Sequence, residues 1–363
     1  MLAIKMKRFN LILLLALCSC LSVMAEVMDS TVLYPSVDQF GQPITLSGKL
    51  SVPRDRTPKG ILLMPHYTVT SNKEVPSSTV TLEEKLFRDE YVIIMPDYLG
   101  YGVTSDRVHP YLDGELAARN SVDLLLAMQP VLDSMQLGLP TDSIYIIGAS
   151  QGGATALWIL KLLEEQYAEQ IHVIRCFAAS GPYDVATTYD DAMKRNKTGL
   201  PATIAMLVVG TSEAYNLQLD NDYFFTPAMK RCFNKWIAGK RVKTVPIFFR
   251  MPNHRVSHWM KPQAMDRTQP QTQLLYDGLL RSSLVHYSIT GDTTDTIVPD
   301  WTPQAPLYIL HSTSDEIVTF RCAEHLQRCY ADAPNITWDF GKYGGHLTSI
   351  TLFFARVYNL LNE

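Results

Sequence analysis

Five strand-length runs of apolar residues follow one another along the chain, and stretches with helical periodicity lie between them. A continuous apolar run, as opposed to an alternating one, is typical of a strand covered on both faces, as in a parallel sheet with crossover helices. The pattern therefore predicts an α/β fold with a mostly parallel central sheet and helices on both faces, including helices over 112–133 and 151–169. The runs are "GILLMPH" (60–66), "YVIIMPD" (91–97), "SIYIIG" (143–148), "IHVIRCFAAS" (171–180) and "PLYILHS" (306–312).

The alternation breaks once, between residues 182 and 300. This segment is dense in Pro, Asn, Asp and Thr and contains short helical patches such as "PATIAMLVVG" and "TPAMKRCFNKWIAGK". A stretch of this length is too long for a simple loop. We therefore expect a largely helical cap (182–300) inserted into a core formed by residues 26–181 and 301–363.

The first 25 residues have the three parts of a secretory signal. Basic Lys5, Lys7 and Arg8 precede the apolar run "LILLLALCSCLSV", and small residues follow before a predicted cleavage after Ala25. We expect export, to the medium or to a periplasm, and no stable membrane span because the apolar run is short. Two alternatives stay open, an uncleaved anchor and a lipid anchor at Cys20.

Charge and cysteine content narrow the possible partners. The chain carries 32 Lys and Arg against 36 Asp and Glu, a formal net charge of −4, and no Lys/Arg cluster stands out after the first residues. That pattern does not favour nucleic acid as a partner. The four cysteines beyond the signal show no metal-like pairing, so we expect no metal site and no organic cofactor. They are Cys176, Cys232, Cys322 and Cys329.

A lone serine, Ser150, stands where a predicted strand gives way to a predicted helix. The sequence from Gly148 to Gly152, "GASQG", matches the nucleophile elbow G-x-S-x-G. The glycines have a physical reason, since side chains two residues either side of a strained turn would collide at a crowded junction. The motif predicts Ser150 as a nucleophile and the N–H of Gln151 as one oxyanion donor. The alternative interpretation is that Ser150 only caps a helix.

A serine hydroxyl needs a base and an orienting carboxylate, and after such an elbow they follow in the order acid, then histidine. His346 lies in the glycine-rich "YGGHLTS" near the end of the chain, and Asp315 follows the strand-like run in "PLYILHSTSDEIV". We predict that they are the base and the acid. We expect His311 to lie inside the strand and Glu316 to point elsewhere. The remaining histidines after the elbow are alternatives, or ordinary loop residues.

The second oxyanion donor is expected in the loop after the first apolar run, "MPHYTVTSNKEVPSS". We favour Thr68, with Tyr67 as the alternative. Asp97 also ends a strand-like run, but it precedes the elbow and a glycine-rich turn follows it. We interpret Asp97 as a structural residue.

Four segments in order, "PDYLGYG", "GASQGG", "WTPQAPLYILHSTSDEIV" and "YGGHLTS", resemble the secretory lipase family of the α/β-hydrolase superfamily over roughly residues 45–360. The resemblance implies Ser150 as nucleophile, Asp315 as acid and His346 as base, with a cap inserted before the acid strand. Members of the superfamily often have His-Gly in the oxyanion loop, whereas here Tyr67 follows His66.

These observations predict a secreted serine hydrolase of the esterase or lipase type, which cleaves carboxylic esters through an acyl-enzyme. The substrate would be a small-molecule or lipid ester, because the many large apolar side chains of residues 182–300 could in part line an acyl pocket. An exported serine peptidase and a carbohydrate acyl esterase remain alternatives with the same triad. A non-catalytic binding protein is a third, although such a protein has no use for a strained serine.

Overall fold

The computed structural model describes residues 26–285 and 301–363. The predicted signal, its cleavage after Ala25 and the anchor at Cys20 lie outside these residues, as do residues 286–300 of the predicted cap.

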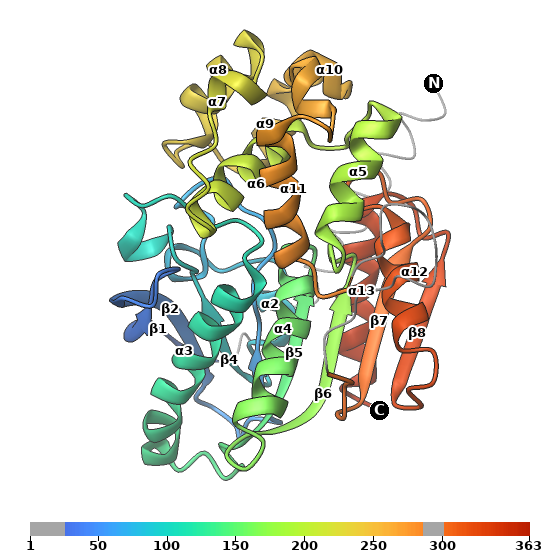
Figure 1. Ribbon diagram of the computed structural model, residues 1–363. Coiled ribbons are helices and arrows are strands. Elements are labelled where there is room, and N and C mark those ends of the chain that lie inside the picture. Colours follow the sequence, from blue (N-terminus) through green and yellow to red (C-terminus); the bar gives the residue numbers. More distant parts are fainter. Residues whose placement is uncertain (1–25, 286–300) are drawn as a thin grey trace, which may run out of the picture.

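One eight-stranded sheet organises the chain, in the order β1-β2-β4-β3-β5-β6-β7-β8 (Figure 1). The first two strands form an antiparallel hairpin at one edge, and β2 is also antiparallel to β4. All later neighbours are parallel. The strands are β1 (Val27–Val37), β2 (Pro43–Pro53), β3 (Ile61–Leu63), β4 (Val92–Pro96), β5 (Ser143–Ala149), β6 (His172–Ala179), β7 (Leu307–Ser312) and β8 (Ile336–Gly341).

Both faces of the sheet are covered, which explains the continuous apolar runs. Ile61 and Leu63 of β3 pack into one hydrophobic cluster with helices α3, α4 and α12, whereas Leu62 packs into another with α2 and α13. The predicted α/β class and its parallel strands are therefore confirmed. The helices are α2 (Glu84–Phe87), α3 (Gly114–Met135), α4 (Gln151–Gln166), α12 (Phe320–Cys329) and α13 (His346–Leu360), and 3₁₀ turns occupy Pro76–Ser78 and Gly102–Thr104.

Between β6 and β7 the described residues 182–285, called here the helical segment, add no strand to the sheet. They form their own hydrophobic cluster, in which Tyr111 of the main body also takes part, and stand at one end of the molecule (Figure 1). The elements are α5 (Val185–Arg195), α6 (Pro201–Ala214), α7 (Asn221–Phe224), α8 (Pro227–Cys232), a π-helical turn (Phe233–Ile237), α9 (Thr244–Arg250), α10 (Val256–Trp259), a 3₁₀ turn (Pro262–Met265) and α11 (Pro270–Arg281).

The helices that cover the sheet are too short or too polar to cross a lipid bilayer, and this holds for every helix in residues 26–285 and 301–363.

Candidate active site

Ser150 occupies a strained turn between β5 and α4. Its backbone has φ 57° and ψ −125°, and its N–H donates to the carbonyl of Ala179 at 2.8 Å. A side chain at Gly148 would place Cβ 2.0 Å from the carbonyl oxygen of Gly152, and one at Gly152 would place it 2.1 Å from that of Pro65. Only glycine fits these two positions without a shift of the neighbouring backbone.

His346 reaches Ser150 from the other end of the chain. It is the first residue of α13, directly after Gly344, whose φ is 87°, and Gly345. The Nε2 atom lies 2.9 Å from Ser150 Oγ, and Nδ1 lies 2.6 Å from Asp315 Oδ2. The three predicted triad residues thus form one hydrogen-bonded chain, although 196 positions separate the serine from the histidine.

The Asp315 carboxylate is held from both sides. Its Oδ1 accepts from the N–H groups of Ile317 and Val318, each at 2.9 Å, while Oδ2 faces His346. Burial by itself raises the pKa of this carboxyl, but the neighbouring His346 and the hydrogen bond from Val318 help to outweigh burial and hold the pKa below its usual value. Asp315 therefore stays ionised at neutral pH and can orient an imidazole.

Two neighbours of the acid lie beside triad residues, and one of them, Glu316, differs from what the sequence indicated. The Glu316 side chain does not point away from the site, because its Oε2 accepts from the backbone N–H of His346 at 3.0 Å and so caps α13. His311, which lies in β7 as expected, places Nε2 3.7 Å from Asp315 Oδ2 and 3.2 Å from the carbonyl of Val318. Burial lowers the pKa of His311, which leaves the imidazole neutral.

The loop after β3 lies against the first turn of α4, where the carbonyls of Pro65 and His66 approach Gly152. Thr68 is in this loop, and its Oγ1 lies 2.7 Å from the hydroxyl of Tyr111. Both candidate donors, Thr68 and Tyr67, therefore belong to a loop that packs on the residue two positions after the serine.

Gln151, the other proposed donor, has its side chain fixed by a residue that the sequence did not single out. The amide Nε2 lies 2.9 Å from His109 Nε2, while His109 Nδ1 lies 2.7 Å from the carbonyl of Leu99. Since a carbonyl only accepts, Nδ1 donates to it and Nε2 accepts from the Gln151 amide. Burial lowers the pKa of His109 to about 3, so it keeps this neutral form. Because 42 positions separate His109 from Gln151, no short sequence motif indicated this contact.

Asp97 takes part in a polar network whose side-chain hydrogen bonds include no triad residue. Its Oδ2 accepts from the hydroxyl of Ser47 at 2.6 Å, and its Oδ1 accepts from the N–H of Ser77 at 2.9 Å. This arrangement ties β2, β4 and the turn at Pro76–Ser78 together.

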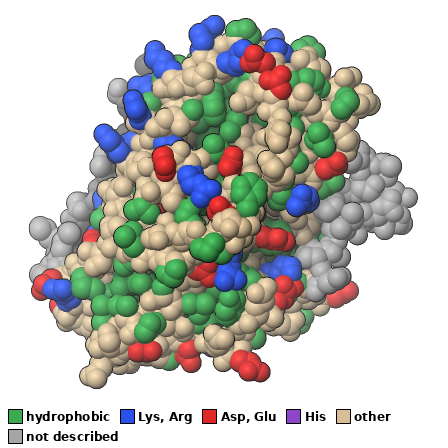
Figure 2. Space-filling model, turned by 60° about the vertical axis from the view of Figure 1, so that its left-hand side comes forward, with side chains coloured by type: hydrophobic (Ala, Val, Ile, Leu, Met, Phe, Trp, Pro, Cys, Tyr) green, Lys and Arg blue, Asp and Glu red, His purple; other side chains and the backbone are tan. Residues whose placement is uncertain are grey.

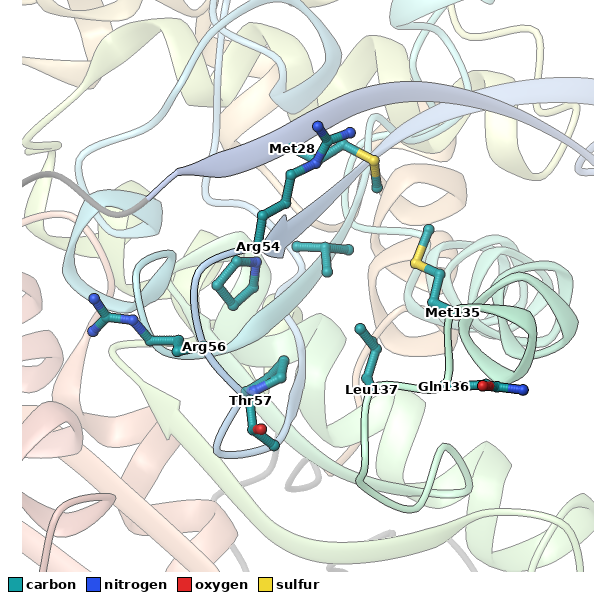
Figure 3. Close-up of a pocket in the computed structure, with 10 residues that line it drawn as sticks. Met28, Arg54, Arg56, Thr57, Met135, Gln136 and Leu137 are labelled. Carbon is teal, nitrogen blue, oxygen red and sulfur yellow. The ribbon is translucent and has the colours of Figure 1, made fainter.

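Other possible binding features lie elsewhere. A hollow of about 390 Å³ is lined by Met28, Arg54, Thr57, Met135 and other residues (Figure 3). The last residues of β2, Val52 and Pro53, border this hollow. Because β2 runs antiparallel to β4, and β4 runs parallel to β3 and β5, the hollow lies near the end of the sheet where β5 begins, whereas Ser150 follows the last residue of β5.

All four cysteines in the described part of the chain are unpaired thiols, and that part contains no group of three or more His, Cys, Asp or Glu side chains that could hold a metal ion.

Known proteins resemble this chain in sequence and in fold. A model of the secretory lipase family matches residues 77–354. A secreted triacylglycerol lipase of Malassezia furfur is 24% identical over 255 residues, 70% of this chain and 57% of the relative. A second, from Malassezia restricta, is 24% identical over 283 residues, 75% of this chain and 54% of the relative. The chain thus spans just over half the length of these two lipases.

Among solved structures, the rice cell wall degrading esterase LipA from Xanthomonas oryzae superposes with a TM-score of 0.76 at 19% identity, covering 96% of this chain and 91% of that one. Candida antarctica lipase A has a TM-score of 0.64 at 15% identity, covering 91% and 78%. At such identities the likeness shows the fold. Together with the family match over more than half of the residues, it establishes that this chain has the α/β-hydrolase fold and belongs to the secretory lipase family.

Proposed function

We propose that the protein is a secreted serine hydrolase of carboxylic esters that works through an acyl-enzyme. The observation that carries the proposal is the hydrogen-bonded chain from Ser150 through His346 to Asp315, with the serine on a strained elbow. Family membership agrees with it, and so does the description of the Malassezia furfur relative as a triacylglycerol lipase. Those relatives are described as secreted, which supports export through residues 1–25.

In the proposed reaction, Ser150 Oγ attacks the ester carbonyl while His346 Nε2 takes its proton. The negative charge on the carbonyl oxygen meets the N–H of Gln151 at the positive end of α4, with Thr68 as the second donor. His346 then protonates the leaving alcohol, and water, activated by the same imidazole, releases the acid. Asp315 holds the imidazole in the required tautomer throughout.

Residues 182–300 are proposed as the cap over this site. The support is that Tyr111, which contacts Thr68, packs into the cluster of the helical segment, and a side chain at Gly210 of α6 would approach the Tyr111 backbone to 2.5 Å. Large apolar residues of this segment differ in their burial. Phe224, Met229 and Trp259 are buried in the segment, while Trp236 and Phe248 are only partly buried.

The triad is tested by substitution. Ser150→Ala and His346→Ala should each abolish hydrolysis of p-nitrophenyl butyrate in a folded protein, and Asp315→Asn should lower kcat about 10⁴-fold. Ser180→Ala is the matched control, since Ser180 also follows a strand, has φ 47° and is buried, but its Oγ faces Ser349 at 3.1 Å. Near-normal turnover by Ser150→Ala, or a loss as large in Ser180→Ala, would refute the assignment.

Assays of the wild-type protein with several substrates distinguish the proposed substrate classes. Each methylene buried in an apolar pocket contributes about 0.8 kcal/mol, so kcat/KM should rise from acetate to butyrate or hexanoate esters and fall for longer chains. Peptide anilides should react far more slowly. A preference for acetylated sugars would favour the carbohydrate esterase, and efficient anilide cleavage the peptidase.

A further inference from the structure

One stretch of the helical segment has an unusual charge balance. Residues 223–265 contain nine Lys and Arg and no Asp or Glu, in a chain whose acids outnumber its bases 36 to 32. The expectation that no cationic cluster stands out after the first residues is therefore wrong for this stretch. Its cations occur in short groups, Lys230-Arg231 and Lys240-Arg241 with Lys243, or singly, and aromatic and aliphatic residues separate them. No long basic run results, so the stretch is recognised by its lack of carboxylates.

Most of these cations face solvent. Arg231, Lys235, Arg241, Lys243, Arg250 and Arg255 are exposed. In the part of the chain that the structure describes, these six have no carboxylate within ion-pair distance, whereas the partly buried Lys230 is paired with Asp222 at 2.7 Å. Lys and Arg side chains gather over the upper end of the molecule in Figure 2, the end that α7 to α10 form in Figure 1.

Large apolar side chains are exposed among these cations. On α9, Val245 is 61% exposed and Phe249 is 79% exposed, while Ile247 is buried beneath them. Their spacing of four residues places both on one side of the helix. Lys235 Nζ and Arg250 Cζ each lie 5.7 Å from the ring centre of the partly buried Trp236. We call Lys235, Lys243, Val245, Phe249 and Arg250 the cationic–apolar face.

This face is fixed beside the oxyanion loop. The N–H and hydroxyl of Thr244, at the start of α9, donate to the Glu74 carboxylate at 2.9–3.0 Å. The hydroxyl of Thr244 in turn accepts from the N–H of Thr70 at 2.9 Å, and Asn72 N–H donates to the carbonyl of Lys240 at 2.9 Å. The loop that carries Thr68 and the base of α9 are thus one hydrogen-bonded unit.

We propose that the cationic–apolar face docks the protein on a bilayer whose surface carries anionic phospholipid headgroups. Cations would meet the phosphates, and Val245 and Phe249 would enter the region between headgroups and acyl chains, as interfacial segments do. A soluble polyanion would need the cations alone and would leave the two apolar side chains in water. Docking would bring the oxyanion loop close to the lipid surface. The inference goes beyond ester hydrolysis, because binding needs no nucleophile.

The test measures co-sedimentation of the Ser150→Ala protein with vesicles, so that hydrolysis does not change the surface. Phosphatidylcholine vesicles with about 30 mol% phosphatidylglycerol should bind it, pure phosphatidylcholine should not, and binding should weaken as salt rises from about 0.05 to 0.5 M. In that background, Val245→Ser/Phe249→Ser and Lys235→Glu/Lys243→Glu should each lower the partition coefficient by about 10-fold or more.

Two control variants carry the same kinds of substitution at exposed residues outside the cationic–apolar face. Leu33→Ser/Leu82→Ser removes two apolar side chains that are each 61% exposed, and Lys85→Glu/Lys342→Glu reverses two exposed charges. Both should stay within about 2-fold of the parent. Every variant keeps the same N-terminus, so any contribution of residues 1–25 is common to all. Equal losses in the controls, equal binding to pure phosphatidylcholine, or strong binding to heparin or duplex DNA that Phe249→Ser leaves unchanged would overturn the proposal.

Discussion

At the residue scale, the best-defined support of the proposed oxyanion site is the neutral imidazole of His109. It accepts from the Gln151 side chain and donates to the carbonyl of Leu99. The ring centres of Tyr98 and Tyr101 lie 6.0 and 4.9 Å from the centre of the imidazole. A protonated imidazole would repel the Gln151 amide, because both would then be donors. Burial, by lowering the pKa of His109 to about 3, prevents this.

His109→Phe keeps the ring and its packing but leaves two buried polar groups unpaired, so it should lower the free energy of unfolding by about 1–3 kcal/mol at pH 7. The folded-state pKa lies below the ordinary value of 6.5, so the stability that wild-type protein gains from this imidazole is present above pH 6.5 and lost as pH falls towards 3. The cost of the substitution should therefore shrink on acidification. Urea unfolding at several pH values measures it, and a cost that grows as pH falls would contradict the assigned tautomer.

At the element scale, the junction of β5, α4 and the oxyanion loop leaves no room for one more carbon. A Cβ on Gly152 would lie 2.1 Å from the carbonyl oxygen of Pro65 and 2.9 Å from that of His66. These are backbone atoms of the loop that carries Thr68, so relief requires the loop to move. The helix and the loop can therefore approach closely only through a glycine.

Gly152→Ala should reverse the usual benefit of alanine in a helix. The gain of about 1 kcal/mol from helix propensity is outweighed by overpacking that costs about 1–3 kcal/mol. Since the loop shifts against the serine, kcat for p-nitrophenyl butyrate should fall about 100-fold with little change in KM. Gly239→Ala, where the nearest atom to the new Cβ is 3.8 Å away, is the control and should keep normal kcat. Unchanged kcat in Gly152→Ala would show that the loop position is not critical.

At the scale of the whole molecule, one cation joins the helical segment to the main body. Lys240 Nζ donates to the carbonyls of Gly100, Ser105 and Arg107, and lies 5.1 Å from the ring centre of Tyr101. The hydroxyl of Tyr101 donates to the carbonyl of Val69 at 2.5 Å, so the contact continues into the oxyanion loop. Three carbonyls from one loop are thus satisfied by a residue about 140 positions away.

Lys240→Met should release this contact without unfolding the protein. We expect hydrogen exchange of the amides in 70–74 and 100–107 to accelerate by about 5-fold or more, because local opening no longer breaks three charge-assisted hydrogen bonds. Lys243→Met, which removes an exposed lysine three residues away, should leave these rates unchanged. Equal acceleration in both variants would mean that loss of charge, and not loss of the carbonyl contacts, loosens the loop.

The sequence by itself was sufficient for the features that neighbouring residues encode. Continuous apolar runs predicted the parallel strands, and the glycines around Ser150 predicted the elbow, because each feature leaves a recognisable pattern within a short stretch of sequence. It was insufficient for the hairpin of β1 and β2, whose β1 has exposed positions at an edge and no continuous apolar run, although Asp38 and Gly41 form a turn there. Only the tertiary structure decided that Glu316 caps α13, that His109 holds Gln151 and that Lys240 enters a loop of the main body. Each of these contacts joins groups 30 or more positions apart, so its existence depends on how the elements pack and leaves no periodic trace in the chain.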